Sequence, residues 1–194
     1  QVTDYPRDVG SLKVAPTGSR IALSMEVLPD CDPACTKGKM EAEEKSKATG
    51  RTYDRIFIRH WDTWSDGSRS HLFVAAIGAD GKAGKPTDLS KALHADVPSE
   101  PFGGDEDYTF SPDGNTLVFS ARIAGRTEPW STNFDLFEVP ADGTAAPKNL
   151  TASNPAWDAQ PVFLKNGDLA YLAMKRAGFE ADRFHVVLRD ARTG

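Results

Sequence analysis

The chain has 194 residues, of which 39% are hydrophobic and 26% are charged, and its 28 acidic and 23 basic side chains give a formal net charge of −5. This is an ordinary composition for a globular protein. An acidic chain without a basic run argues against nucleic acid or an anionic membrane as the main partner. No apolar stretch approaches the roughly 18 residues that span a bilayer.

The first predicted elements are two strands joined by a glycine turn within residues 14–25, which read Val-Ala-Pro-Thr-Gly-Ser-Arg-Ile-Ala-Leu-Ser-Met. Proline fixes the backbone angle φ at one turn position, and Gly18 accepts the positive φ that other residues avoid. After the turn, Ile21, Leu23 and Met25 fall on alternate positions. A period of two is typical of a strand that packs on one face.

Residues 29–53 lack this alternation, and we expect them to be an insertion between the second and third strands of the first unit. The insertion contains Cys31 and Cys35 and a stretch rich in Glu and Lys. Two cysteines are too few for a structural zinc site and the four histidines are scattered, so no metal and no cofactor is expected. Two alternatives stay open: a pair of free surface thiols, or a local disulfide, which would indicate an oxidising compartment.

The third and fourth strands of the first unit are predicted near residues 72–74 and 88–90, on either side of an Asp-Gly turn at Gly81. The unit then spans residues 8–90. The spacing of the turn glycines would also admit a complete extra unit in this region. We prefer the insertion, because one third-strand signal and one fourth-strand signal are found before residue 100.

The second unit, residues 105–151, repeats the pattern without an insertion. It begins with the strand pair of residues 110–123, whose turn reads Ser-Pro-Asp-Gly, and continues with predicted strands near residues 136–139 and 149–151. The shared turn chemistry and the shared period of two predict the same four-stranded unit.

The third unit, residues 157–194, contains the strand pair of residues 163–173 and a third strand at Val186-Val-Leu188, but its fourth strand is missing. The fold predicted for residues 1–194 is therefore all-β: about three blades of a β-propeller, each a four-stranded antiparallel meander, with the last blade incomplete. Three incomplete blades cannot close a ring, so we expect a fragment of a longer protein. The open edge of the third blade predicts self-association.

The Pro-Asp-Gly repeat resembles that of TolB-type and prolyl-oligopeptidase propellers. More specific are four segments in a fixed order: residues 59–74, which begin Arg-His-Trp-Asp-Thr-Trp-Ser-Asp-Gly, residues 107–114, Ala156-Trp-Asp158, and residues 174–183. Together they resemble the N-terminal β-propeller of bacterial prolyl-oligopeptidase-family serine peptidases of the dipeptidyl aminopeptidase and acylaminoacyl-peptidase type.

The resemblance implies a two-domain serine peptidase in which the propeller gates the access of short peptides to a separate C-terminal α/β-hydrolase domain. That domain would supply Ser, Asp and His. The nucleophile motif Gly-x-Ser-x-Gly is absent from this chain, since Gly67-Ser-Arg-Ser-His71 does not fit it. By resemblance the parent protein is an enzyme, while the chain itself is expected to carry no catalytic residue.

A four-stranded meander places its short glycine turns at one end and its longer connections at the other. We call the second end the long-loop face and expect it to meet the hydrolase domain and the substrate, because binding sites usually arise in loops on a rigid scaffold. It comprises residues 28–70, 90–107, 122–133, 151–158 and 175–183. The four tryptophans, Trp61, Trp64, Trp130 and Trp157, also map to it, where loop packing or a domain interface is the expected role.

Five charged residues of these loops are candidate substrate contacts: Asp105, Glu106, Glu180, Asp182 and Arg183. In related dipeptidyl peptidases, two propeller glutamates hold the ammonium group of the substrate through charge-assisted hydrogen bonds. The Glu-Glu pattern is absent here, so the resemblance indicates only the loops in which such contacts would lie and does not identify the residues. The alternative is that these are solvated loop charges.

The predicted function is that of the propeller segment of a serine exopeptidase, periplasmic or secreted, with the hydrolase domain and a peptide substrate as partners. The alternative is a TolB-like, non-enzymatic, protein-binding propeller. A cytoplasmic location is the alternative if the cysteines are free thiols.

Overall fold

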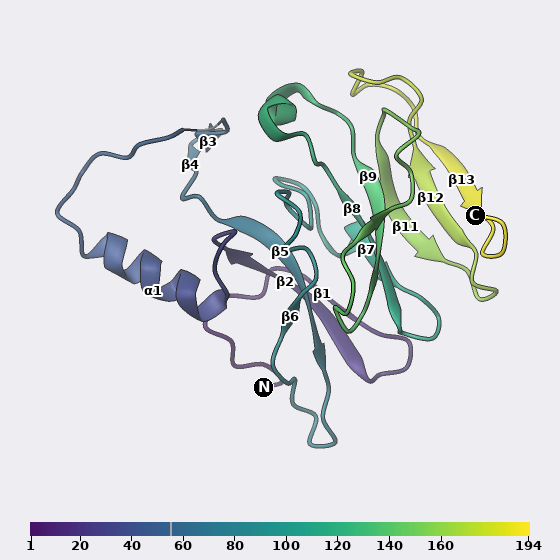
Figure 1. The fold of residues 1–194 in the computed structure, drawn as a ribbon, viewed down its shortest axis with the longest axis horizontal. Helices are drawn as coiled ribbons and strands as arrows, with labels where there is room; N and C mark the ends of the chain where they lie inside the picture. Colours follow the sequence, from purple (N-terminus) through teal and green to yellow (C-terminus); the bar gives the residue numbers. More distant parts are fainter. Residues whose placement is uncertain (55) are drawn as a thin grey trace.

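The structure is a computed structural model that describes residues 1–54 and 56–194. Most of its regular structure is antiparallel β-sheet (Figure 1). The first sheet has the order β1-β2-β5-β6, with β1 at Leu12–Val14, β2 at Arg20–Val27, β5 at Arg69–Ala76 and β6 at Thr87–Asp88. The predicted hairpin of residues 14–25 is confirmed, because Val14 pairs with Ile21 across the turn at Gly18, where φ is 70°.

Strands β2 and β5 pair directly over eight residues although a long segment separates them in the sequence. That segment holds α1 (Pro33–Glu44) and a short hairpin of β3 (Arg59–His60) and β4 (Thr63–Trp64). The helix was not predicted from the sequence, because its polar residues lack an amphipathic period. It begins where Asp32 accepts a hydrogen bond from the Cys35 N–H group at 2.8 Å and Pro33 occupies the first turn.

The second sheet is a meander in the order β10-β9-β8-β7. Its strands are β7 at Tyr108–Phe110, β8 at Thr116–Ala121, β9 at Asp135–Pro140 and β10 at Lys148–Asn149. Two 3-10 turns accompany it: η1 (Asp105–Asp107) precedes β7, and η2 (Gly125–Trp130) lies between β8 and β9. These strands confirm the pattern predicted from the Ser-Pro-Asp-Gly turn.

The third sheet has the order β11-β12-β13, with β11 at Asp158–Phe163, β12 at Leu169–Ala173 and β13 at His185–Arg189. A bulge between Ala159 and Val162 interrupts the pairing of β11 with β12. Within the part of the chain that the structure describes, β13 pairs with β12. The self-association predicted from this edge stays a prediction.

The three sheets lie face to face in chain order (Figure 1). The core between the first and second sheets contains Ala22, Leu72, Val74, Leu117, Phe119 and Val139. A smaller core between the second and third contains Val118, Leu136 and Leu169. The first and second sheets therefore each contribute alternate side chains to two different cores, which is the physical reason for the period of two.

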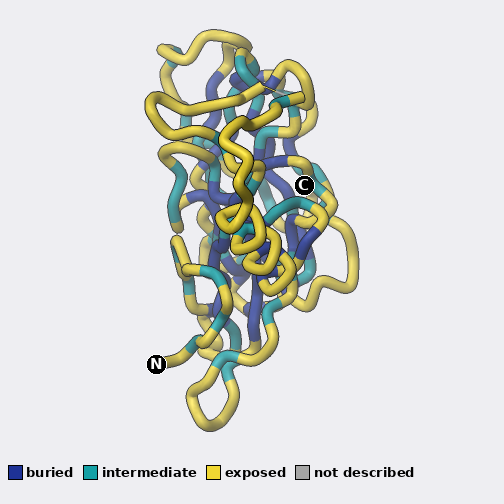
Figure 2. Tube along the Cα trace, turned by 90° about the vertical axis from the view of Figure 1, so that its left-hand side faces the viewer, coloured by how far each residue is buried: buried dark blue, intermediate teal, exposed yellow. Residues whose placement is uncertain are grey.

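The two outer faces of the stack differ. That of the first sheet is buried and contains Ile21, Leu23, Met25, Val27, Phe73 and Ala75, with Tyr5 packed against it. Figure 2, which looks onto this side, shows exposed chain, including α1, in front of buried strands. The outer face of the third sheet is open, since Val162, Val186 and Leu188 are 55%, 77% and 59% exposed.

Short turns and long connections lie at opposite ends of the stack. The β3–β4 hairpin and the β12–β13 connection lie at the upper end of Figure 1, and the β5–β6 turn lies at the lower end. The short turns of the first two sheets contact each other there: the side chain of Arg20 donates a hydrogen bond to the Gly114 carbonyl at 3.0 Å. The meander geometry thus produces the predicted separation of the two ends.

Candidate functional site at the long-loop face

One arginine joins three segments of the long-loop face. Arg69, at the start of β5, donates hydrogen bonds to Asp96 at 2.7 Å and to both carboxylate oxygens of Glu128, in η2, at 2.7 and 2.8 Å. The carboxylate side chains are 17% and 8% exposed. Burial raises the pKa of Asp96, and the neighbouring Arg69 opposes that rise. This ion cluster fixes the 90–107 and 122–133 loops to the first sheet.

Two further carboxyl groups beside this cluster have no comparable partner among the described residues. Burial raises the pKa of Glu26, near the end of β2, to about 7; the negative charges of Glu100, Asp96 and Asp66 add to the rise, and Arg7 opposes it. Burial also raises the pKa of Glu100, with a contribution from Asp96, while the nearby His60 lowers it. The local field is therefore negative, and a cation would relieve it.

Exposed aromatic rings lie next to these carboxylates. Trp61 contacts Phe102 with ring centroids 5.6 Å apart, which joins the β3–β4 hairpin to the 90–107 loop. The two residues are 68% and 77% exposed. We call Glu26, Glu100, Trp61 and Phe102 the acidic–aromatic site. It combines two carboxyl groups whose pKa values are raised, despite the nearby Arg7 and His60, with an apolar surface. This arrangement suits a cationic group attached to an apolar body.

The other predicted tryptophans divide between exposed and packed positions. Trp64 and Trp130 are 55% and 68% exposed. Trp157 instead stacks on Phe134 at 4.7 Å and meets Phe184 edge-on at 5.9 Å. It packs loops together, which is the role expected for such residues.

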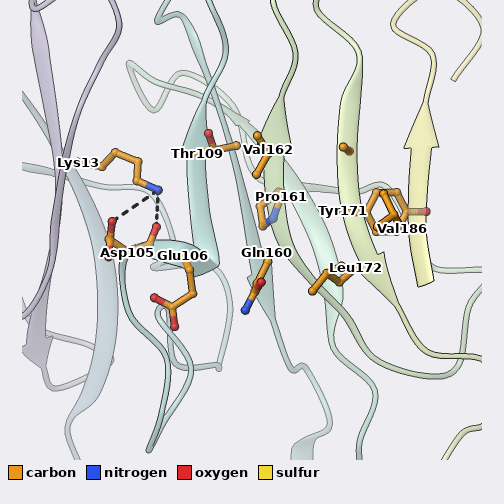
Figure 3. Close-up of a pocket in the computed structure, with 11 residues that line it drawn as sticks. Lys13, Asp105, Glu106, Thr109, Gln160, Pro161, Val162, Tyr171, Leu172 and Val186 are labelled. Carbon is orange, nitrogen blue, oxygen red and sulfur yellow. Dashed lines mark hydrogen bonds and ion pairs between the residues drawn. The ribbon is translucent and has the colours of Figure 1, made fainter. Parts of the chain in front are cut away.

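The predicted acidic residues Asp105 and Glu106 lie in η1 and line a cavity of about 490 Å³ (Figure 3). Asp105 forms an ion pair with Lys13 of β1 at 3.8 Å. The opposite wall belongs to the third sheet and includes Gln160 and Tyr171. The cavity brings Glu106 close to the bulge of β11, where Gln160 has a positive φ of 51°.

The other predicted group, Glu180, Asp182 and Arg183, lies in the β12–β13 connection. Asp182 accepts hydrogen bonds from the N–H groups of Lys175 and Arg176 at 3.0 and 2.9 Å, which lowers its pKa to about 2. Its ion pair is with Arg176 at 3.3 Å. Among the described residues no ion pair is found for Arg183. Asp182 therefore shapes its own loop, and the structure does not bring this group together with Glu106.

Sequence reasoning missed Arg69, Glu128 and Glu26 as site residues. Glu26 and Arg69 lie in neighbouring pairs at the loop ends of β2 and β5, where a polar residue is unremarkable, and Glu128 stands in the short 3-10 turn η2. Their position could have predicted this cluster, because all three residues lie at the loop ends of elements that the meander places side by side.

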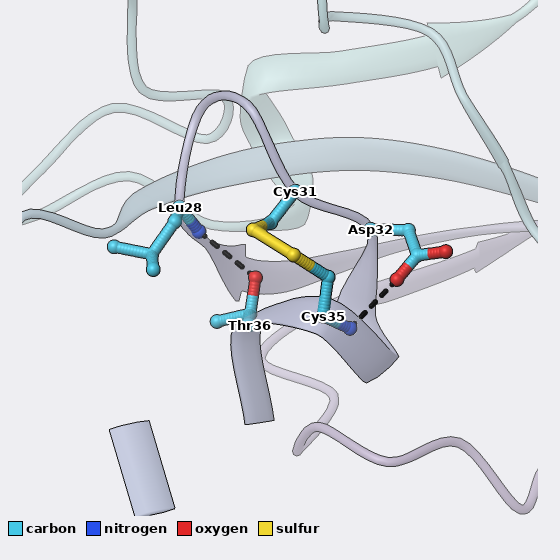
Figure 4. The surroundings of a disulfide bond; sticks show 5 residues. All are labelled: Leu28, Cys31, Asp32, Cys35 and Thr36. Carbon is cyan, nitrogen blue, oxygen red and sulfur yellow. Dashed lines mark hydrogen bonds between the residues drawn. A yellow bond between two sulfur atoms is a disulfide. The ribbon is translucent and has the colours of Figure 1, made fainter. Parts of the chain in front are cut away.

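The two cysteines form a disulfide, with Cα atoms 5.3 Å apart (Figure 4). This decides between the two alternatives left open by the sequence. In the described ranges, 1–54 and 56–194, no group of three or more potential metal ligands is found. No helix of that part of the chain is long and apolar enough to cross a membrane.

Comparison with known proteins finds no family model that matches the chain. Curated relatives do match. The chain is 31% identical over 165 residues to dipeptidyl-peptidase 5 of Arthroderma otae, an alignment that covers 76% of this chain and 23% of the relative. It is 30% identical over 193 residues to the probable dipeptidyl-peptidase 5 of Arthroderma benhamiae, with 90% and 27% covered.

A bacterial relative, dipeptidyl-peptidase 5 of Porphyromonas gingivalis, is 29% identical over 150 residues, with 76% of this chain and 22% of the relative covered. Among solved structures, TolB from Acinetobacter baumannii aligns with 97% of this chain and 42% of its own at a TM-score of 0.34 and 13% identity. That score does not establish a common fold. The chain thus spans about a quarter of the length of these dipeptidyl-peptidase 5 relatives.

Proposed function

We propose that this chain forms three consecutive blades of a β-propeller within a longer serine exopeptidase of the prolyl-oligopeptidase type. The observation that carries the proposal is the similarity to dipeptidyl-peptidase 5 over 90% of the chain. The first two sheets are four-stranded antiparallel meanders packed face to face, as in propeller blades. The open apolar face of the third sheet, at Val186 and Leu188, suits a following blade.

In this proposal the long-loop face contacts an α/β-hydrolase domain and gates the entry of short peptides. Trp61, Phe102 and Trp130 support it, since three large aromatic side chains are more than two-thirds exposed in the long loops. Aromatic residues are enriched in protein interfaces, where they supply much of the binding energy.

We further propose that the acidic–aromatic site receives the ammonium group of the peptide. Glu26 and Glu100 suit this role better than the predicted Glu106 and Glu180, because burial and neighbouring carboxylates raise the pKa of both groups. An ammonium group would supply the missing counter-charge through charge-assisted hydrogen bonds. Glu100, although also an exposed residue, lies near Asp96 and His60, whereas Glu180 lies on the separate β12–β13 connection.

The test uses the full-length enzyme and two substrates with the same leaving group, a free-amine dipeptide and its N-acylated form. Glu100→Gln should lower kcat/KM for the free-amine substrate about 10- to 100-fold, the range of a lost charge-assisted hydrogen bond. The N-acylated substrate should change less than about threefold. Glu180→Gln makes the same charge change at an exposed loop position and should affect both substrates equally. Equal losses in Glu100→Gln would contradict the anchor.

A matching proposal concerns location. A disulfide persists in oxidising compartments, so Cys31–Cys35 supports a periplasmic or secreted protein. Cell fractionation of the native host, with the cysteines alkylated during lysis, tests this: the chain should be found oxidised in the periplasmic or extracellular fraction.

A further inference from the structure

Helix α1 is poorly stabilised by its own sequence. Its first half carries Lys37 and Lys39, and its last turns carry Glu41, Glu43 and Glu44. The negative charges in the last turn oppose the helix dipole, and the exposed i,i+4 ion pair of Lys37 with Glu41 at 4.0 Å offsets only a small part of this. Gly38 in the interior further disfavours the helix. The helix therefore depends on what holds it to the rest of the chain.

The contacts that hold α1 are concentrated in its first turn. Pro33 and Thr36 are its buried residues. The Thr36 hydroxyl accepts a hydrogen bond from the Leu28 N–H group at 3.1 Å, and Asp32 caps the helix. The later turns are mostly exposed, and the helix extends away from the first sheet (Figure 1).

The disulfide closes this same turn (Figure 4). Cys31 is 4% exposed and follows the end of β2, whereas Cys35 is exposed on the helix. The covalent link thus runs from a buried position beside the first sheet to the first turn of a helix that has few other attachments. Neither cysteine lies in a strand, so the link contributes no residue to the pairing of β2 with β5.

We propose that the Cys31–Cys35 disulfide is a redox-sensitive latch that keeps α1 folded and docked. A dithiol reductant opens it: a thiolate attacks the exposed Cys35 sulfur, the S–S bond breaks, and Cys31 leaves as a thiolate that takes up a proton. The second thiol of the reductant then displaces Cys35. Two electrons and two protons pass to the protein, and the dithiol becomes a disulfide. The reduced segment loses α1 while the sheets persist.

The latch acts on the segment that leads to the β3–β4 hairpin. This hairpin carries Trp61 and Trp64 on the long-loop face. Loss of α1 removes the one helix between β2 and the hairpin among the described residues, so the redox state of the two cysteines controls how firmly these aromatic residues are presented. The inference does not depend on the proposed peptidase role.

Hydrogen–deuterium exchange of the oxidised and dithiothreitol-reduced chain tests the latch. The cross-linked residues are four positions apart, and closing so small a loop is worth roughly a 30-fold change in the opening equilibrium. We expect the amides of residues 37–44 to exchange about 30-fold faster after reduction, while β2, β5 and β8 change less than about twofold. A C31S/C35S variant should reproduce the fast exchange and ignore dithiothreitol.

Asp32→Ala is the matched control, because it removes the cap and leaves the disulfide in place. It should accelerate exchange in α1 by less than about tenfold and keep the response to reduction. Unchanged exchange in α1 after reduction of the wild-type chain would overturn the proposal. Equal acceleration in α1 and the strands would also overturn it, because the disulfide would then stabilise the whole fold. Both outcomes are read from the wild-type protein, whether or not a variant folds.

Discussion

Replacing Arg69 by methionine should destabilise the chain by about 3 kcal/mol at pH 7. The substitution keeps much of the apolar volume and leaves Asp96 and Glu128 without their counter-ion. Removing one partner of a buried ion pair typically costs about 3–5 kcal/mol. The lower end applies, because the Arg69 and Asp96 side chains are 24% and 17% exposed and water screens part of the charge. For a chain of this length, the midpoint of thermal unfolding should fall by roughly 6–12 °C.

The stability loss in Arg69→Met should depend on pH. Arg69 opposes the rise in the pKa of Asp96, so its removal raises that pKa further in the folded state. A folded-state pKa above the unfolded value means that stability is lost as pH rises through the gap between them. Arg69→Met should therefore cost more at pH 7 than at pH 4, as measured by urea unfolding at both values.

The triple variant R69M/D96N/E128Q separates charge from shape, because it removes the stranded carboxylates and keeps similar volumes. It should recover most of the lost stability. The reasoning is refuted if Arg69→Met costs less than 1 kcal/mol, or if the triple variant is as unstable as the single one.

Two further predictions concern charge burial and turn geometry. The Glu26 carboxyl has a folded-state pKa of about 7 against an ordinary 4.5, so the stability of the wild type falls as pH rises between these values. Glu26→Gln should be as stable as wild type near pH 4 and more stable by about 1–3 kcal/mol at pH 8. Equal stabilities of the two proteins at both pH values would contradict the pKa shift. At Gly143, φ is 70° and an added Cβ would lie 2.7 Å from the Thr87 side chain. Gly143→Ala should lower the free energy of unfolding by about 2 kcal/mol or more. Gly18 has the same φ but open space around it, so Gly18→Ala should lower that energy by about 1 kcal/mol. Equal urea midpoints for the two variants would show that the contact of the added Cβ with Thr87 is unimportant.

The strands were predictable because their signals are local. A turn glycine with positive φ, as at Gly114, followed by alternating apolar residues such as Leu117 and Phe119, specifies a hairpin within about a dozen residues. The two-residue strands β6 and β10 were also placed correctly, at Asp88 and Asn149, because each follows its turn at a similar distance.

Helix α1 and the ion cluster could not be predicted in the same way. The start of α1 carries a visible signal in Asp32-Pro33, yet its later residues bury almost nothing and so leave no periodic pattern. Arg69 and Glu128 come together because face-to-face stacking brings the loop ends of two sheets into contact. A contact of that kind depends on the packing of sheets and not on any short stretch of sequence.

The central claim is that three successive sheets are consecutive propeller blades whose long-loop face serves a neighbouring catalytic domain. The most direct test is an experimental structure of the full-length protein. We predict that the outer face of the third sheet, at Val186 and Leu188, packs against a fourth antiparallel sheet, and that Trp61 and Phe102 face an α/β-hydrolase domain. A third sheet covered by helices, or a catalytic domain at the end of the short glycine turns, would contradict the account.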